Sequence, residues 1–204
     1  MDGYLLLILA GLAFAFYLWY KRHSRKAALS ILPPQFVVAD IETTGLDADK
    51  HEIIEIAAVR VNRDSNNHDY WTALIKPSKK VPKKITDITG ITQEMIEKEG
   101  QQLERAMEEF LSFVGDHRLV FFNAEFDTAF LDRAAMRIGR QLPNKVSCAL
   151  KMTRRAYPGL KSYRLKDLAN VGNLDSTGSH RALKDCELTV TVYASAAAKL
   201  QRIE

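Results

Sequence analysis

Cysteine is scarce in this 204-residue sequence, which contains only Cys148 and Cys186. Their separation does not match the spacing of a metal site, and each lies within or beside an apolar helical pattern. This pattern does not indicate a thiolate metal site, and a disulfide between the two cysteines is the alternative to two free thiols. Both cysteines are expected to be reduced core residues, which is typical of a reducing compartment.

A strong excess of one charge is also missing, because 29 basic residues stand against 25 acidic ones and give a formal net charge of +4. That small basic excess favours a polyanionic partner. The length and the hydrophobic share of 47% suit one domain with an ordinary core and an appendage. We expect no second independent fold.

Long uncharged hydrophobic runs are absent except at the N-terminus, where residues 3–20 carry no charge. At about 1.5 Å per residue, such a run can span a hydrocarbon core of about 30 Å as one helix. The positive charge that precedes a cleaved signal peptide is lacking, whereas Lys21 and Arg22 follow the run. These features predict a single-pass anchor in the inner membrane, with the rest of the chain in the cytoplasm. A hydrophobic helix buried in the domain is the alternative. The predicted division is anchor 1–22, basic and proline-containing tether 23–35, and folded domain 36–204.

The stretch at residues 36–46 delivers two acidic side chains to the end of a predicted strand. Alternate side chains of a strand share a face, so Asp40 and Glu42 are expected to point the same way. Ile41 then points to the opposite face, and Gly45 favours a turn where the strand ends. Two like charges at that separation need a cation between them. Taken alone, the stretch also fits an ordinary strand that runs into a polar loop.

Two later stretches carry carboxylates in a meaningful order. Residues 123–127 read Asn-Ala-Glu-Phe-Asp after an apolar run, and residues 180–185 read His-Arg-Ala-Leu-Lys-Asp before the last predicted helix. With Asp-Ile-Glu-Thr-Thr-Gly-Leu at 40–46, they resemble the three motifs of the DEDDh exonuclease family. That family includes the epsilon proofreading subunit of the bacterial replicative polymerase, RNase T and oligoribonuclease.

The resemblance covers about residues 36–200 and departs from the family pattern at two places. Phe122 stands where the family usually has histidine, and residues 147–149 read Ser-Cys-Ala where an Asp-Thr pair is frequent. Neither place is an acidic or base position. The departures therefore bear on substrate preference and leave activity as expected.

The resemblance implies a two-metal site. Asp40 would bridge two ions, and Glu42 and Asp185 would complete the position that holds the attacking water. Asp127 would hold the second ion. Four carboxylates without a thiolate suit two Mg²⁺ or Mn²⁺ ions. His180 is the candidate general base, because an imidazole can accept a proton near neutrality.

The resemblance also implies contacts to the terminal nucleotide of a nucleic acid with a free 3′ end. Leu46 would pack on its base, and the Gly-Ile-Thr segment at 90–92 would lie beside the strand end. Such contacts read shape and the free end more than sequence. The predicted substrate-binding residues are Thr43, Thr44, Gly45, Leu46, Ile91, Asn123 and Phe126.

The expected fold is α/β and ribonuclease H-like, with a five-stranded mixed sheet flanked by helices, plus one N-terminal transmembrane helix. Strand patterns begin at residue 36 and occur at 52–61, 70–75, 119–122 and 146–150. Helical patterns occur at 93–99, 103–114, from about 124, and at 151–157, 163–171 and 182–202. Residues 78–84 are interpreted as a basic loop, either solvated or in contact with phosphate.

The most basic part of the predicted domain also contains two tyrosines, Tyr157 and Tyr163. Cations with interleaved aromatic rings suit single-stranded nucleic acid, although core packing is the alternative role for the two rings. The cations are Lys151, Arg154, Arg155, Lys161, Arg164 and Lys166.

The sequence therefore predicts a membrane-tethered 3′–5′ exonuclease that releases nucleoside 5′-monophosphates from DNA or RNA. One alternative is an inactive membrane-tethered module that only binds nucleic acid. A polymerase proofreading subunit is another, which the chain favours less because it stops at Glu204 without the C-terminal extension that relatives use to reach their polymerase.

Overall fold

The computed structural model describes residues 31–201. The predicted anchor at 1–22, with its apolar run at 3–20, lies outside the described residues, as does the tether up to residue 30. Across the part that is described, none of the helices combines the length and the apolarity that a membrane crossing requires. The structure thus bears on the folded domain and leaves the anchor a prediction.

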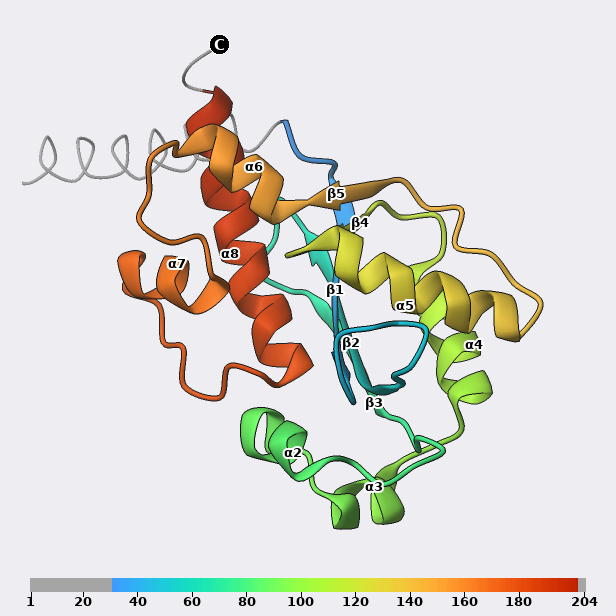
Figure 1. Cartoon of the computed structure of the whole chain (residues 1–204). Coiled ribbons are helices and arrows are strands. Elements are labelled where there is room, and N and C mark those ends of the chain that lie inside the picture. The colour runs from blue at the N-terminus through green and yellow to red at the C-terminus, as the bar shows by residue number, and fades with distance from the viewer. Residues whose placement is uncertain (1–30, 202–204) are drawn as a thin grey trace, which may run out of the picture.

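A five-stranded sheet forms the centre of the domain, in the order β3-β2-β1-β4-β5 (Figure 1). Its strands are β1 Gln35–Thr43, β2 Ile53–Asn62, β3 Asp69–Leu74, β4 Leu119–Phe121 and β5 Val146–Cys148. β2 pairs antiparallel with β1 and β3, whereas β4 pairs parallel with β1 and β5. The predicted mixed sheet of five strands is confirmed.

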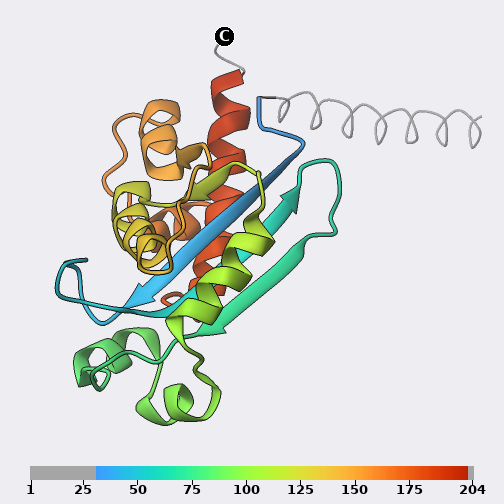
Figure 2. The ribbon, with the colours of Figure 1, turned by 90° about the vertical axis from the view of Figure 1, so that its right-hand side faces the viewer.

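Helices cover both faces of this sheet (Figures 1 and 2). In the described residues they are α2 Lys83–Thr89, α3 Gln93–Glu99, α4 Leu103–Val114, α5 Ala124–Arg137, α6 Ala149–Ala156, α7 Leu165–Val171 and α8 Ala182–Gln201. α4 and α5 pack on one face, whereas α8 packs on the other with α6 beside it. The predicted bounds of α3 and α4 are confirmed.

Alternation along β1 separates the two layers of the core. Val37, Ala39 and Ile41 point to the face covered by α4 and α5. Phe36 and Val38 point to the face covered by α8. All five side chains are buried, so the centre of the sheet is closed on both sides. A ligand can therefore approach this strand only at its ends, where open α/β sheets usually bind.

The helix α2 differs from the sequence prediction, which treats residues 78–84 as a loop. Pro82 occupies the position before the helix, and Gly90 ends it in a left-handed conformation with φ 72. No side chain caps the start of this seven-residue helix, so the sequence carries little helical signal there. The last two lysines of the predicted basic loop, Lys83 and Lys84, therefore belong to a helix. Figures 1 and 2 show α2 and α3 beyond the carboxyl end of β1.

Candidate active site

Three carboxylates meet where β1 ends and α8 begins. Asp40 and Glu42 are alternate residues of β1 on the face that carries α8, and Asp185 lies in the first turn of α8. One oxygen of each carboxylate lies within 4.8 Å of those of the other two. The structure thus brings together the first and the last of the three predicted motifs.

Asp127 approaches this group from the helix layer on the other face. It lies in the first turn of α5 and is 3% exposed. A hydrogen bond with the backbone of Ile41 ties its carboxyl to β1. Among the charges around Asp40, that of Asp127 raises the Asp40 pKa most. Asp127 therefore lies beside Asp40, although it is not one of the three carboxylates that gather within 4.8 Å.

Burial raises the pKa values of all four carboxyl groups, and repulsion by neighbouring carboxylates adds to it for Asp40 and Glu42. Burial is the largest cause, and the pKa of Glu42 and that of Asp127 rise to about 8. The pKa of Asp40 lies well above its ordinary range, because burial is reinforced by the charges of the other three. Burial also raises the pKa of Asp185, against a hydrogen bond from the backbone of His180 that lowers it. A divalent cation would supply the missing countercharge, and this oxygen-only donor set fits Mg²⁺ or Mn²⁺.

In the presence of a chelator, we expect the domain to lose stability as the pH rises. Glu42 and Asp127 have a folded-state pKa of about 8 and an unfolded-state pKa of about 4. Their contribution is therefore fully present below about pH 4 and is lost as the pH rises through about 8. Asp127→Asn removes one of these groups, so at about pH 8 its melting temperature in chelator should exceed that of the wild type.

Mg²⁺ should reverse this order, because an ion that binds only the folded state stabilises it by mass action. Thermal unfolding at about pH 5 and pH 8, with chelator or with Mg²⁺, measures both effects. Asp132→Asn, an exposed carboxylate on the same helix, is the matched control. A wild type whose melting temperature does not respond to Mg²⁺ would contradict the metal assignment.

His180 lies just before α8, beside Asp185. It is exposed, and its φ of 71 is uncommon for a residue other than glycine. Its backbone N–H faces both carboxylate oxygens of Asp185, at 3.4 Å from each. This contact holds His180 at the edge of the acidic group, where its imidazole remains open to solvent. A base that takes a proton from water needs that access.

The turn after β1 forms the predicted nucleotide-binding surface. Thr43 Oγ1 donates to the carbonyl of Gly45 at 2.6 Å, and the N–H of Glu52 donates to Thr44 Oγ1 at 3.0 Å. The threonine side chains therefore shape the turn from within. Leu46 is 85% exposed, so its side chain is available to pack on a base.

His51, for which no sequence motif predicts a role, closes this turn. Its Nδ1 lies 3.3 Å from Thr44 Oγ1. A Cβ added to Gly45 would lie 2.5 Å from the His51 ring, closer than real contacts allow. A larger residue at this position would therefore have to displace the imidazole.

Gly45→Ala is expected to displace the His51 ring and reshape the turn. The displaced ring should shift the turn that would bind the nucleotide, and a loss of about 1.4 kcal/mol of binding free energy would raise the KM for an oligonucleotide roughly tenfold. The double variant Gly45→Ala/His51→Ala removes the obstructing ring and should recover part of this loss. Steady-state kinetics of both variants provide the measurement, and an unchanged KM in Gly45→Ala would remove the turn from substrate binding.

The remaining predicted substrate-binding residues differ in accessibility. Asn123 is exposed at the start of α5, and Phe126 is half-buried with its ring centroid 5.1 Å from that of Phe130. Both therefore lie near Asp127 at the surface. Ile91, by contrast, is fully buried and packs in a small cluster with Ile96. The Ile91 side chain is therefore enclosed by this cluster and is not at the surface.

A comparison with protein families supports the motif interpretation. The sequence model of the family RNase_T, described as exonuclease, matches residues 37–193. The chain belongs to this exonuclease family. This match, together with the similarity to a DNA polymerase III subunit epsilon, shows that the chain is a 3′–5′ exonuclease, which is a phosphodiester hydrolase.

Relatives of this exonuclease include polymerase subunits. DNA polymerase III subunit epsilon of Aquifex aeolicus is 38% identical over 83% of the chain and 84% of that protein. The PolC-type DNA polymerase III of Thermotoga maritima is 39% identical over 78% of the chain, which spans only 11% of that much longer polymerase.

Solved structures share the fold of this exonuclease. Exonuclease I of E. coli in complex with a dT13 oligonucleotide matches 84% of the chain with a TM-score of 0.73, at 18% identity and over 42% of its own length. Exonuclease X in complex with 5′ overhanging duplex DNA matches 82% of the chain and 90% of its own, with a TM-score of 0.58 and 26% identity. The α/β exonuclease fold is thereby confirmed.

The basic segment of the exonuclease uses its tyrosines for packing. The Tyr163 hydroxyl donates to the carbonyl of Tyr157 at 2.7 Å, and the Tyr157 hydroxyl lies 3.0 Å from Ser195 Oγ. Arg154 lies over the Tyr163 ring, 5.5 Å from its centroid. Of the two roles left open by the sequence, these contacts favour packing for the rings. The six cations of the segment stay exposed.

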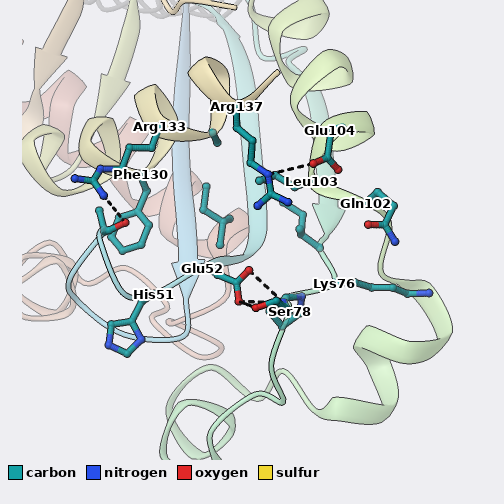
Figure 3. Close-up of a pocket in the computed structure, with 15 residues that line it drawn as sticks. His51, Glu52, Lys76, Ser78, Gln102, Leu103, Glu104, Phe130, Arg133 and Arg137 are labelled. Carbon is teal, nitrogen blue, oxygen red and sulfur yellow. Dashed lines mark hydrogen bonds and ion pairs between the residues drawn. The ribbon is translucent and has the colours of Figure 1, made fainter. Parts of the chain in front are cut away.

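A hollow of about 330 Å³ lies behind the turn of the exonuclease that follows β1 (Figure 3). Arg133 of α5 donates to the carbonyl of Ala48 at 2.9 Å. Glu52 accepts hydrogen bonds from the backbone N–H and the hydroxyl of Ser78, at 3.0 and 2.8 Å. None of the four site carboxylates lines the hollow. Its walls therefore support the turn from behind.

Proposed function

We propose that the protein is a metal-dependent 3′–5′ exonuclease that hydrolyses the last phosphodiester of DNA or RNA and releases a nucleoside 5′-monophosphate. The observation that carries this proposal is the convergence of Asp40, Glu42 and Asp185 within 4.8 Å at the open end of β1. Asp127 is buried beside them. Four poorly compensated carboxylates in a chain of the exonuclease family favour a site for two divalent ions.

The four carboxylates would hold the ions, with Asp40 at the centre of the group, since the charges of the other three act on it. Two Mg²⁺ or Mn²⁺ ions, when bound, would lower the pKa of the attacking water and stabilise the leaving oxygen. His180 would take the proton from that water. The water oxygen would bond to the terminal phosphorus while the bond from that phosphorus to the preceding 3′ oxygen breaks. The leaving 3′ oxygen would take a proton from solvent and become the new 3′-hydroxyl of the shortened strand.

The turn after β1 would bind the terminal nucleotide. Leu46 offers an exposed apolar side chain for the base, while Thr43 and Thr44 hold the backbone of the turn in place. Asn123 and Phe126 lie at the surface beside Asp127 and would complete the contact. Apolar packing and backbone contacts do not distinguish one base from another, so we expect little dependence on sequence.

Matched oligonucleotides test the proposed reaction. Single- and double-stranded DNA and RNA of one sequence, labelled at the 5′ end, are incubated with Mg²⁺, with Mn²⁺ or with chelator. We expect one-nucleotide shortening from the 3′ end, release of 5′-monophosphates, and complete dependence on the metal. A blocked 3′ end should abolish shortening. Binding without shortening would favour the inactive module instead, and shortening in chelator would refute the mechanism.

We also propose that residues 3–20 tether the enzyme to the inner membrane, with the exonuclease domain in the cytoplasm. The support is the uncharged run followed by Lys21 and Arg22. Membrane fractionation of the full chain, followed by protease treatment of intact spheroplasts, tests this arrangement. Release by high salt, or digestion of the domain from outside, would contradict it.

A polymerase-associated role is the second candidate, and the similarity to a polymerase subunit of Aquifex aeolicus favours it. The two roles separate in one experiment. Affinity purification of the membrane-extracted full chain should recover no stoichiometric polymerase if the enzyme acts alone. Stoichiometric recovery of a polymerase catalytic subunit would establish the proofreading role.

A further inference from the structure

A fifth carboxylate lies next to the site, and no step of the proposed reaction uses it. Glu55 lies on β2 directly across from Glu42 of β1 and is 3% exposed. It is not among the carboxylates that gather within 4.8 Å. Because directly opposed like charges destabilise a sheet, a buried Glu55 needs a partner of its own.

Both oxygens of Glu55 are occupied by the start of α8. Oε1 accepts from Arg181 Nε at 3.2 Å and from Arg181 Nη2 at 2.7 Å. Oε2 accepts from Arg181 Nε at 3.2 Å and from the backbone N–H of Ala182 at 2.9 Å. Glu55 therefore binds two consecutive residues that lie between His180 and Asp185 in the sequence.

The backbone bond to Ala182 fixes where the helix begins. The first N–H groups of a helix have no partner within the helix, and a carboxylate is favoured near them. Glu55 takes this place from a neighbouring strand. The next contact along the chain is the one between the His180 N–H and the Asp185 carboxylate. The left-handed backbone of His180 is therefore held by its own N–H contact with Asp185 and by the Glu55 contacts of the two residues that follow it.

The Arg181 side chain also covers most of the Glu55 carboxylate. The Arg181 side chain is 41% exposed, whereas that of Glu55 is 4% exposed. Arg181 and Glu55 both line a hollow of about 320 Å³, together with Thr72, Lys184 and Glu187. Its charge also acts on the site, since it opposes the burial and repulsion that raise the pKa of Glu42.

We propose that Glu55 and Arg181 are positioning residues, whose bidentate ion pair sets the start of α8 so that His180 and Asp185 face the carboxylates of β1. The inference rests on the proposed function for its kinetic consequence. It adds two residues that touch neither substrate nor metal and act through the two that do. A purely structural pair would affect stability and leave the kinetics of the folded enzyme unchanged.

A double-mutant cycle distinguishes the two roles. The variants are Glu55→Gln, Arg181→Met, Arg181→Lys and the double variant Glu55→Gln/Arg181→Met. Arg105→Met/Glu109→Gln on α4 is the matched control, because it removes an exposed ion pair on the other face. Each variant is measured for kcat, KM, melting temperature and amide hydrogen exchange at residues 180–185.

For Glu55→Gln we expect kcat to fall by about 10–100-fold with KM nearly unchanged, as for other residues that orient metal ligands. Arg181→Met should lower the melting temperature most, because it leaves a buried charge without a partner. The double variant should recover the melting temperature and not kcat. Arg181→Lys should recover only part of kcat, because lysine cannot form the two-pronged contact.

Exchange at residues 180–185 should be faster in Glu55→Gln and unchanged in the control. A double variant that regains kcat together with its melting temperature would overturn the proposal, as would unchanged exchange in Glu55→Gln. If the wild type itself releases no nucleotide, the proposed function fails. The exchange measurement then still judges the positioning claim, since it needs neither substrate nor metal.

Discussion

Asp40→Ala is expected to lower kcat by at least about 10³-fold, because losing several kcal/mol of metal-dependent charge stabilisation corresponds to that factor. Asp40 occupies the centre of the acidic group: the charges of Asp127, Asp185 and Glu42 all act on it. Its removal should therefore weaken both ion positions at once. The rate of 5′-monophosphate release from a single-stranded oligonucleotide provides the measurement.

The same variant should not unfold the domain. Loss of a buried charge beside like charges relieves repulsion, so in chelator the melting temperature should hold or rise. Asp132→Ala, an exposed carboxylate outside the site, should keep the wild-type kcat. A folded Asp40→Ala enzyme that retains more than a tenth of the wild-type rate would contradict the assignment of Asp40.

His180→Ala is expected to lower kcat by about 10²–10⁴-fold, the usual effect of losing a general base. KM and the affinity for Mn²⁺ should change little, because the His180 contact with Asp185 uses the backbone N–H, which alanine retains. Adding free imidazole should restore part of the rate to His180→Ala. Pre-steady-state kinetics with and without imidazole test this expectation.

His117→Ala is the matched control, since His117 lies before β4 and is outside the site. It should retain the wild-type rate and show no response to imidazole. If His180→Ala keeps the wild-type rate, His180 is not the base. If the variant loses Mn²⁺ binding together with its rate, His180 is again not the base, and its role would be to hold Asp185.

The sequence predicts well those parts of the site that depend on local patterns. Alternation along residues 36–43 is sufficient to place Asp40 and Glu42 on one face, because a strand has a fixed period of two. The order of the three motifs then identifies Asp127 and Asp185. The sheet brings these segments together since β1 and β4 are parallel neighbours and α8 crosses over β1.

The parts of the site that local sequence patterns do not predict depend on contacts between distant residues. Glu55 appears in the sequence as one acidic residue of an apolar strand, and nothing local pairs it with Arg181. A better signal was available at Glu55 itself, because a charge at an inward-facing strand position needs a partner. The packing of His51 against Gly45 likewise needs the folded turn to be seen.

Two further differences between the sequence prediction and the structure concern Ile91 and α2. Ile91 belongs to the segment that is expected to lie beside the end of the bound nucleic acid strand. This segment follows α2, and the Ile91 side chain packs inward against Ile96. A motif fixes a residue's place along the chain and not the direction of its side chain. The helix α2 carries little sequence signal, since no side chain caps its start and its support comes from Gly90 at its end and from the packing of Ile85 in the Ile91 cluster.

Anomalous scattering from Mn²⁺-soaked crystals of the exonuclease domain is the most direct test of the paired-ion site. We expect two peaks, one among the carboxylates of Asp40, Glu42 and Asp185 and one between Asp40 and Asp127. The His180 imidazole should lie within reach of a water beside the first peak. Peaks only elsewhere on the surface, or none at saturating Mn²⁺, would contradict the account.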